Sequence, residues 1–301
     1  MKKFSRLALL FSLSFISKEN IGYVKFSDNK CLNYRTIDFY YYSSIFAYPQ
    51  NDPTEHLILG NPSQANSTLN SPDNFLIVKH QFAESYNNSK GCANWVSWHL
   101  DPSWKGNAER CNCFSTDKHL PNNFNRIRPE EYSKTGFDRG HLCPSEDRDM
   151  NDQDNAATFL MSNMIPQSPN LNRISWLAVE NYCRKLVDQG FELYIIAGGY
   201  GKGGIGSKGY ADNIGQHHIN VPSHCWKIII ALPLGNKDLD RINSKTTVLA
   251  FDMPNAPHVK QNKWQEYITS IDAIEEKTGY DFFSNLNKDI QYLIEYKITP
   301  L

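Results

Sequence analysis

The chain has 301 residues, of which 40% are hydrophobic and 13% aromatic. This length and composition exclude a disordered or collagen-like protein and a small disulfide-stabilised domain. Its 31 Lys and Arg residues nearly balance 32 Asp and Glu residues, so the net charge of −1 excludes a polybasic, histone-like polymer binder and requires any nucleic-acid contact to be local.

The N-terminus resembles a secretory signal peptide. Positive charges at Lys2, Lys3 and Arg6 precede a mostly apolar run over residues 7–17. The run is shorter than the roughly 20 residues that span a bilayer, so it predicts export without a membrane anchor. Because a small-x-small cleavage motif is missing, an ordinary apolar segment packed on the domain is the alternative. We assign residues 1–20 to a signal peptide and expect a secreted or periplasmic protein without stable membrane association.

Residues 21–55 are rich in Tyr, Ser, Asn and Pro and show no sustained periodicity, so we interpret them as a variable leader. After residue 56 the sequence contains no internal repeat and no Pro- or Ser-rich linker. We therefore assign residues 56–301 to one domain.

Several apolar, β-branched runs predict strands. Residues 75–78 and 93–98 lie on either side of a turn-like segment, which predicts a hairpin. Further runs at residues 192–198, 225–232 and 246–251 predict a central sheet.

Two segments show helical periodicity instead. Apolar residues recur at three- and four-residue spacing over residues 176–187 and again over residues 264–274, which predicts two core-facing helices. Because the helices are few and do not alternate with the strands, we expect an α+β fold with a central antiparallel sheet flanked by helices.

The densest polar stretch, residues 136–145, contains the tetrad Asp-Arg-Gly-His at residues 138–141. Amide-rich segments follow at residues 163–167 and 170–173. A lone His beside an Asp is more often structural than catalytic. A general base, amides able to hold a hard cation, and arginines close together in the sequence nevertheless indicate a catalytic site.

This tetrad resembles the signature of the DNA/RNA non-specific endonucleases, a family with the ββα-metal fold that includes endonuclease G and secreted bacterial nucleases. The resemblance runs from about His56 to residue 295 and is closest to the secreted bacterial branch. It implies a Mg²⁺-dependent endonuclease that cuts single- and double-stranded DNA and RNA without regard to sugar or sequence. The matching segments besides the tetrad are residues 93–96, 106–110, 155–167, 171–173, 180–184 and 278–286.

The resemblance also assigns roles. It implies that His141 is the general base that takes a proton from the attacking water. Asn172 would be the direct protein ligand of Mg²⁺, for which Mn²⁺ is an expected substitute, and water would fill the other positions. Glu180 would orient one of these waters, and Arg184 would share its helix face. On an α-helix that begins near Asn172, Glu180 lies two turns along and roughly 80° around the axis, so both can address one site.

Arg110 and Arg139 would, by the same resemblance, hold the scissile phosphate and stabilise its transition state. Asp138 would order the loop or the neighbouring arginines. Without the resemblance, Glu180 and Arg184 would be interpreted as an exposed salt bridge, and Asp138 as a turn residue.

The cysteines leave alternatives open. Cys111 and Cys113, with Cys143 and His119, suggest a zinc site, but their one-residue spacing is not that of a zinc knuckle. In an exported chain, a disulfide between Cys143 and either Cys111 or Cys113 is expected, because the family brings these segments to one site. Cys183 lies on a predicted core-facing stripe and is interpreted as a buried thiol.

Two further features receive ordinary interpretations. His217-His218 and His224-Cys225 are interpreted as surface and edge residues, since adjacent residues on a strand point to opposite faces. The Gly-rich residues 198–215 lack a phosphate-binding loop motif and predict a flexible loop beside the substrate groove.

Two other functions compete with the nuclease. An inactive nucleic-acid-binding module of the same fold would show a defect at His141, Asn172 or Arg110, and the sequence shows none. A metal-dependent phosphohydrolase acting on a phospholipid would need an amphipathic or polybasic segment, which the sequence lacks. Nucleic acid is therefore the expected partner, and a protein inhibitor is a further candidate partner.

Overall fold

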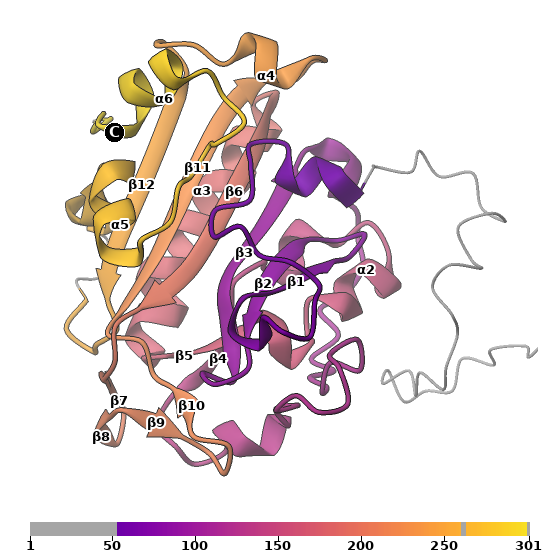
Figure 1. Ribbon diagram of the computed structural model, residues 1–301, viewed down its shortest axis with the longest axis vertical. Coiled ribbons are helices and arrows are strands. Elements are labelled where there is room, and N and C mark those ends of the chain that lie inside the picture. The colour runs from indigo at the N-terminus through magenta and orange to yellow at the C-terminus, as the bar shows by residue number, and fades with distance from the viewer. Residues whose placement is uncertain (1–52, 260–262, 300–301) are drawn as a thin grey trace, which may run out of the picture. The chain divides into compact units, whose positions relative to one another are not determined.

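A seven-stranded antiparallel sheet forms the centre of the computed structural model, which describes residues 53–259 and 263–299 (Figure 1). The predicted signal peptide and nearly all of the predicted leader lie outside the described residues. In order across the sheet, the strands are β1 (Phe75–Val78), β2 (Ala83–Asn87), β3 (Cys92–Leu100), β6 (Phe191–Tyr200), β11 (His224–Pro233), β12 (Thr247–Pro254) and β13 (Ile268–Thr269).

The predicted strands and the antiparallel sheet are confirmed, but the predicted hairpin is wrong. β2 lies between its two expected partners and pairs antiparallel with both β1 and β3. The composition of β2 hides it, because Glu84, Ser85 and Asn87 are polar and yet all are buried. A period-two pattern of apolar residues cannot reveal a strand whose polar side chains find partners inside the protein.

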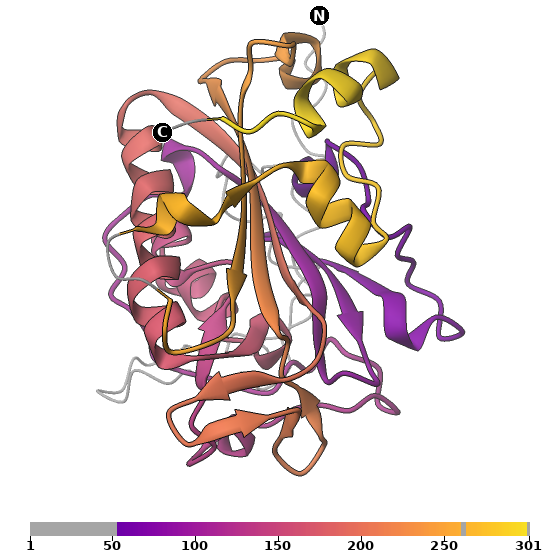
Figure 2. The same cartoon turned by 90° about the vertical axis from the view of Figure 1, so that its left-hand side faces the viewer.

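Both faces of the sheet are covered by helices. On β11, Cys225, Ile229 and Ala231 belong to one apolar core, together with residues of α3 (Leu177–Asp188). Trp226, Ile228 and Ile230 point the other way and pack with residues of α5 (Ile271–Thr278) and α6 (Lys288–Glu295). Figure 2 shows α3 on one side of the sheet and α5 and α6 on the other. β11 is buried on both sides, as its largely apolar sequence predicts.

The first predicted helix is confirmed as α3, but the second is not continuous. Residues Trp264–Tyr267 form a single 3₁₀ turn, and Ile268–Thr269 then pair with β12 as the edge strand β13. α5 begins only after Ser270, whose Oγ accepts a hydrogen bond from the Ala273 amide at 3.2 Å. A β-branched pair followed by a helix-capping serine explains why the apolar spacing did not produce one helix.

A second, smaller sheet lies on the α3 side of the molecule. β4 (Asp138–His141) pairs antiparallel with β5 (Met164–Gln167), and the connection between them contains the short helix α2 (Asp152–Ala157). A helical segment that ends in α3 follows β5 directly. This strand-strand-helix unit is the arrangement that the family resemblance implies.

The Gly-rich stretch is not a flexible loop. It forms two short hairpins, β7 (Gly204–Gly206) with β8 (Gly209–Ala211), and β9 (Asn213–Ile214) with β10 (Ile219–Asn220). The Ser207 amide donates to the Gly136 carbonyl at 2.8 Å, just before β4 begins. Glycines at these positions allow the hairpin to approach β4 closely, since a Cβ at Gly206 would lie 2.5 Å from the Gly136 carbonyl oxygen.

No helix among residues 53–259 and 263–299 is long and apolar enough to cross a membrane.

Candidate active site on β4, β5 and α3

His141 ends β4 and is 7% exposed. Its ring packs edge-on against Phe159, with 4.8 Å between ring centroids, and at 5.6 Å from Phe114. Its backbone carbonyl accepts a hydrogen bond from Trp176 Nε1 at 3.3 Å. The histidine is therefore fixed by its own strand and by two aromatic rings.

The His141 ring is neutral and incompletely satisfied. Its Nε2 is buried and has no hydrogen-bond partner among the described residues. Burial, and then the nearby Arg110 guanidinium, lower the pKa of His141 to about 3. Buried polar atoms are nearly always paired, so an unpaired ring nitrogen indicates a place for a reactant.

Arg110 is held beside this histidine. Its Nη1 donates to Ser145 Oγ at 2.7 Å, and its Nε donates to Asn112 Oδ1 at 3.1 Å. Its guanidinium carbon lies 4.9 Å from the centre of the Phe159 ring, the same ring that packs on His141.

Arg139 is positioned in the same manner. Its Nε and Nη2 donate to the Pro129 carbonyl at 3.1 and 2.9 Å. Its guanidinium carbon lies 4.9 Å from the centre of the Phe114 ring. Phe114 and Phe159 thus place both predicted phosphate-binding arginines around one imidazole.

Asp138 binds the predicted metal ligand. Its carboxylate accepts from Asn172 Nδ2 at 2.9 Å, and from Arg173 Nε and Nη2 at 2.8 and 2.6 Å. Because the Asn172 NH₂ group is engaged by Asp138, its carbonyl oxygen Oδ1 remains for a cation. This geometry agrees with the predicted role of Asp138 in ordering its neighbours. It does not agree with the alternative interpretation of Asp138 as a turn residue, because its side chain makes three hydrogen bonds.

The helix that carries Asn172 is not a regular α-helix at its start. Residues Leu171–Trp176 form a π-helical turn, and the α-helical part begins at Leu177. The expectation of roughly 80° between Asn172 and Glu180 is therefore wrong, because it assumed α-helical rotation throughout.

Glu180 and Arg184 are not an exposed salt bridge, since they are only 8% and 9% exposed. Arg184 instead binds Asp147 Oδ1 at 3.1 Å and Glu146 Oε2 at 2.9 Å. The nearest cation to Glu180 is the buried Lys227, whose Nζ lies 3.7 Å from Oε1. Burial raises the pKa of Glu180 to about 7, although Lys227 and Arg184 oppose that rise.

The predicted residues form two linked groups. Arg110 lowers the pKa of His141 and interacts electrostatically with Glu180, so these three surround one polar region. Asp138 and Asn172 form the second group, joined to the first because β4 carries both Asp138 and His141. The supporting residues that the sequence did not reveal are Asn112, Phe114, Ser145, Asp147, Phe159 and Lys227.

The cysteine expectations need correction. Cys111 and Cys113 form a disulfide with each other, so they are neither zinc ligands nor partners of Cys143. Cys143 is a free, buried thiol, held inside because its backbone N–H and C=O both bind the Asn163 side chain, at 2.9 and 2.8 Å. Cys183 is buried, as predicted.

Of the residues interpreted as surface and edge, Cys225 does not fit, because it is fully buried on the inner strand β11. His218 is exposed, and the partly exposed His217 pairs with Glu131 at 2.8 Å.

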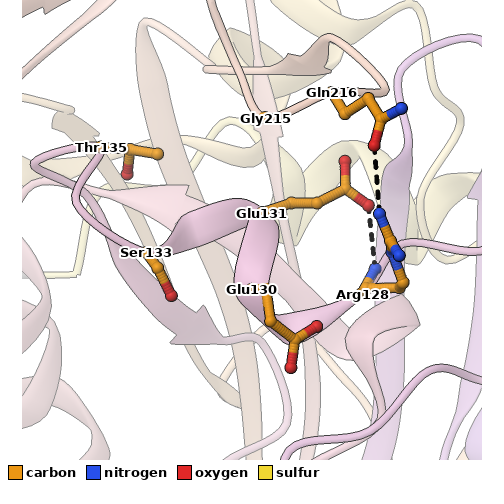
Figure 3. Close-up of a pocket in the computed structure, with 7 residues that line it drawn as sticks. All are labelled: Arg128, Glu130, Glu131, Ser133, Thr135, Gly215 and Gln216. Atoms are coloured by element: carbon orange, nitrogen blue, oxygen red, sulfur yellow. Dashed lines mark hydrogen bonds between the residues drawn. The ribbon is translucent and has the colours of Figure 1, made fainter.

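A shallow hollow lies between the 3₁₀ turn that begins at Pro129 and the turn that joins β9 to β10 (Figure 3). Arg128 and Glu130 flank that proline, and Arg128 Nη2 donates to Gln216 Oε1 at 3.1 Å. The hollow is lined by Arg128, Glu130, Glu131, Ser133, Thr135, Gly215 and Gln216.

Comparison with known proteins identifies relatives over most of the chain. The family model described as DNA/RNA non-specific endonuclease matches residues 59–289. A protein named nuclease from Nostoc sp. is 50% identical over 243 residues, which cover 81% of this chain and 85% of that protein. The mitochondrial nuclease EXOG of Danio rerio is 32% identical over 210 residues, which cover 68% of this chain and 59% of that protein.

A solved structure shares the fold. The EndoG/EndoGI complex, described as showing the mechanism of EndoG inhibition, matches with a TM-score of 0.66 and 22% identity, covering 80% of this chain and 95% of that chain. The match agrees with the mixed α+β architecture and its strand-strand-helix unit.

Proposed function

The chain belongs to the DNA/RNA non-specific endonuclease family and is an endonuclease, and we propose that it cuts both DNA and RNA. In this proposal Mg²⁺ is the cofactor and His141 is the general base. The observation that carries this proposal is the unpaired Nε2 of His141, buried beside Arg110.

His141 is suited to accept a proton. At physiological pH its imidazole is neutral, because its pKa is lowered to about 3 in the free protein. A phosphodiester anion beside the ring is expected to raise that pKa, since a nearby negative charge favours the protonated form. The base therefore becomes stronger when substrate binds, and Nε2 is the atom that receives the proton from water.

The arginines supply positive charge where the transition state gathers negative charge. Arg110 and Arg139 are already fixed by hydrogen bonds and by the Phe159 and Phe114 rings, so little reorganisation is needed when the phosphate binds. Guanidinium groups bind phosphate oxygens in pairs and read no base edge. This agrees with cutting that is independent of sequence.

The oxygen donors at this site fit a magnesium ion. Asn172 Oδ1 would bind it directly and Glu180 through water, and neutral carbonyl, carboxylate and water ligands are those that Mg²⁺ prefers. When bound, the ion supplies Lewis-acid stabilisation of the phosphate and leaving-group oxygens. Asp138 contributes by holding the Asn172 amide in one orientation. Mn²⁺ is expected to substitute.

Export also belongs to this proposal. The signal-like N-terminus and the Cys111–Cys113 disulfide both support a secreted or periplasmic protein, because disulfides persist mainly in oxidising compartments. A protein inhibitor is a candidate partner, since the structural neighbour was solved in the EndoG/EndoGI complex.

The test is hydrolysis of supercoiled plasmid and of total RNA by the purified protein with Mg²⁺, with EDTA, and as His141→Ala. We expect cutting of both polymers, loss of cutting in EDTA, and strong loss in the variant. His218→Ala, at an exposed histidine, is the control and should cut normally. Binding without cutting, or unchanged cutting by His141→Ala, would overturn the proposal.

A further inference from the structure

Lys227 is a buried lysine on an apolar face of the central sheet. It lies on β11 opposite Ala197 of β6 and Phe251 of β12, and its side chain is 1% exposed. Cys225 and Ile229 precede and follow it on the same face. Burying an ammonium group in apolar surroundings lowers the free energy of unfolding unless other groups interact with the charge. The contacts of Lys227 therefore indicate the role of this residue.

Compensation comes from two tryptophans and one carboxylate. Lys227 Nζ lies 4.3 Å from the centre of the Trp176 ring and 5.4 Å from the centre of the Trp98 ring. Glu180 is the one carboxylate within ion-pair distance of Nζ among residues 53–259 and 263–299. Cation–π contacts of this kind stabilise a desolvated ammonium.

Both tryptophans also hold parts of the site. Trp176 Nε1 donates to the His141 carbonyl at 3.3 Å. Trp98 Nε1 donates to Asp147 Oδ2 at 3.0 Å, and Asp147 Oδ1 in turn accepts from Arg184. Lys227 therefore contacts two rings, one of which is bonded to the His141 backbone and the other to Asp147.

Within the described part of the chain, Lys227 is the one cation within ion-pair distance of the Glu180 carboxylate. Arg184 follows it by one helical turn, yet its ion pairs go to Asp147 and Glu146. The distance of 3.7 Å from Lys227 is longer than a hydrogen bond. An attraction at this distance orients the carboxylate while leaving its oxygens able to bind water.

We propose that Lys227 is a positioning residue that holds Glu180 in its working orientation at the cation site. The proposal rests on the proposed function for what Glu180 does, but the pairing of Lys227 with Glu180 can be tested without it. The lysine stem suits the position, because four methylenes pack along the apolar face while the compact ammonium reaches the carboxylate.

The activity test is a double-mutant cycle with Lys227→Met and Glu180→Gln. Methionine keeps the length and apolar stem but removes the charge. We expect Lys227→Met to lower kcat about 10- to 100-fold with KM little changed, as loss of an outer-shell partner typically does. In the Glu180→Gln background it should cause no further loss, because the residue through which it acts has been neutralised.

A matched control separates charge from packing. Ile229→Met alters the next residue on the same buried face and leaves every charge in place. It should keep kcat within a few-fold of the wild type. Equal losses in Ile229→Met and Lys227→Met would overturn the proposal, and so would losses from Lys227→Met and Glu180→Gln that simply multiply.

A stability readout in EDTA tests the pairing independently of activity. Glu180→Gln removes the carboxylate partner of a buried ammonium, so its effect on the urea midpoint of unfolding should be less favourable in the wild-type background than in the Lys227→Met background. This arm remains informative if the protein does not cut nucleic acid. If Lys227→Met fails to fold, Lys227→Gln takes its place in the cycle, and equal midpoint changes on Glu180→Gln in the two backgrounds would show that the two residues are not coupled.

Discussion

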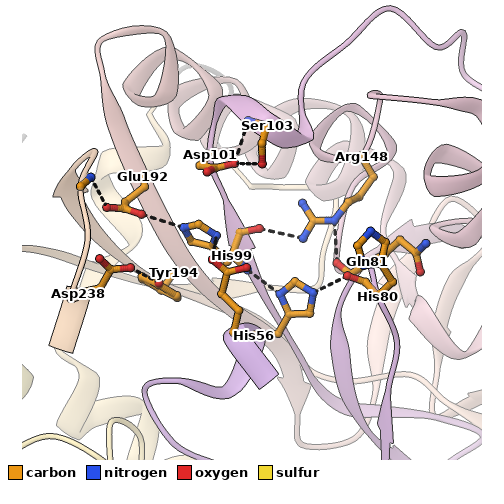
Figure 4. A network of polar contacts seen from close by, with 12 residues as sticks. His56, His80, Gln81, His99, Asp101, Ser103, Arg148, Glu192, Tyr194 and Asp238 are labelled. Carbon is orange, nitrogen blue, oxygen red and sulfur yellow. Dashed lines mark hydrogen bonds and ion pairs between the residues drawn. The ribbon is translucent and has the colours of Figure 1, made fainter. Parts of the chain in front are cut away.

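Two buried histidines, His141 and His99, have different partners and opposite shifts in pKa. They are 7% and 2% exposed. His99 lies on β3 with Nδ1 2.8 Å from Glu55 and Nε2 3.1 Å from Glu192 (Figure 4). Burial alone would lower the pKa of His99, but its hydrogen bonds with Glu192 and Glu55 outweigh burial and raise it to about 9. The pKa of His141 shifts the opposite way, because burial and then the nearby Arg110 guanidinium both lower it.

The surroundings of His99 are saturated. Its ring stacks on Tyr194 with 4.6 Å between centroids, and its carbonyl accepts from Arg148 at 2.8 Å. His99, Glu192 and Asp238 lie close enough to suggest a metal site, but Arg241 already binds both carboxylates. Burial therefore does not distinguish a structural histidine from a reactive one. What distinguishes them is the charge that faces the ring, which comes from the carboxylates of Glu55 and Glu192 at His99 and from the Arg110 guanidinium at His141.

The largest expected effect is on activity at His141. His141→Ala should lower kcat/KM on the order of 10²- to 10⁴-fold, because it removes the proton acceptor. The free energy of unfolding at pH 7 should also fall, because the packing of the ring against Phe114 and Phe159 is lost, although no hydrogen bond at Nε2 is lost with it. Initial rates on plasmid and urea unfolding curves measure the two quantities. A large loss of stability with full activity in the folded fraction would show that His141 is a structural histidine and not the general base.

The next effect is on stability at His99. His99→Gln should lower the free energy of unfolding by about 3 kcal/mol at pH 6, the value of a pKa raised from 6.5 to about 9. Because the folded pKa is raised, this contribution is complete below pH 6.5 and is lost as pH rises through 9. Urea unfolding of both proteins from pH 6 to pH 9.5 should show the difference shrinking. A difference that stays constant with pH would mean that His99 is not protonated in the fold.

At His141 the free energy of unfolding should depend on pH in the opposite direction to that at His99. Its folded pKa is lowered to about 3, so below pH 6.5 the unfolded chain binds a proton that the folded chain does not. Stability is therefore lost as pH falls, at about 1.4 kcal/mol per pH unit for this one group. His141→Ala removes this loss, and its stability relative to the wild type should rise between pH 6.5 and pH 5. Parallel curves for the two proteins would contradict the lowered pKa.

The smallest effect concerns a single contact in the reactive region. Asn112→Ala removes the hydrogen bond from Arg110 Nε but leaves the one to Ser145 and the Phe159 ring. We expect kcat/KM to fall about 3- to 10-fold, near 1 kcal/mol. Asn66→Ala, at an exposed asparagine remote in sequence, is the control. A loss as large as that of His141→Ala would mean that Asn112 does more than support the arginine.

The two histidines also show what the sequence could reveal. The tetrad at residues 138–141 resembles a known family, and this resemblance predicts roles for His141, Asp138 and Arg139, and for Asn172 and Glu180 further along the chain. His99 lies near the end of β3, directly after the run that the sequence predicts as a strand, and no recognisable motif contains it. Its partners Glu55 and Glu192 are separated from it by 44 and 93 residues, and only the folded sheet brings them together.

Lys227 and β2 were missed for a related reason. In a sequence, a polar residue inside an apolar run indicates the end of a strand or an exposed position. Lys227 on β11 and Glu180 on α3 come within 3.7 Å of each other only because α3 packs on the sheet. The predicted pairing of Cys143 is wrong because Cys111 and Cys113 bond to each other, and proximity of segments in the sequence pattern does not decide which cysteines pair. Runs of β-branched residues, by contrast, need no distant partner, and they located β3, β6, β11 and β12.

The π-helical turn at Leu171–Trp176 has a consequence for insertions and deletions. Such a turn accommodates a residue more than the α-helical turn it replaces, so removing one residue there would let α3 extend backwards as a regular helix. Asn172 would then be carried around the helix axis and away from Asp138, although no side chain at the site had been altered. The number of residues in this turn therefore sets the direction in which Asn172 faces, whichever residues they are.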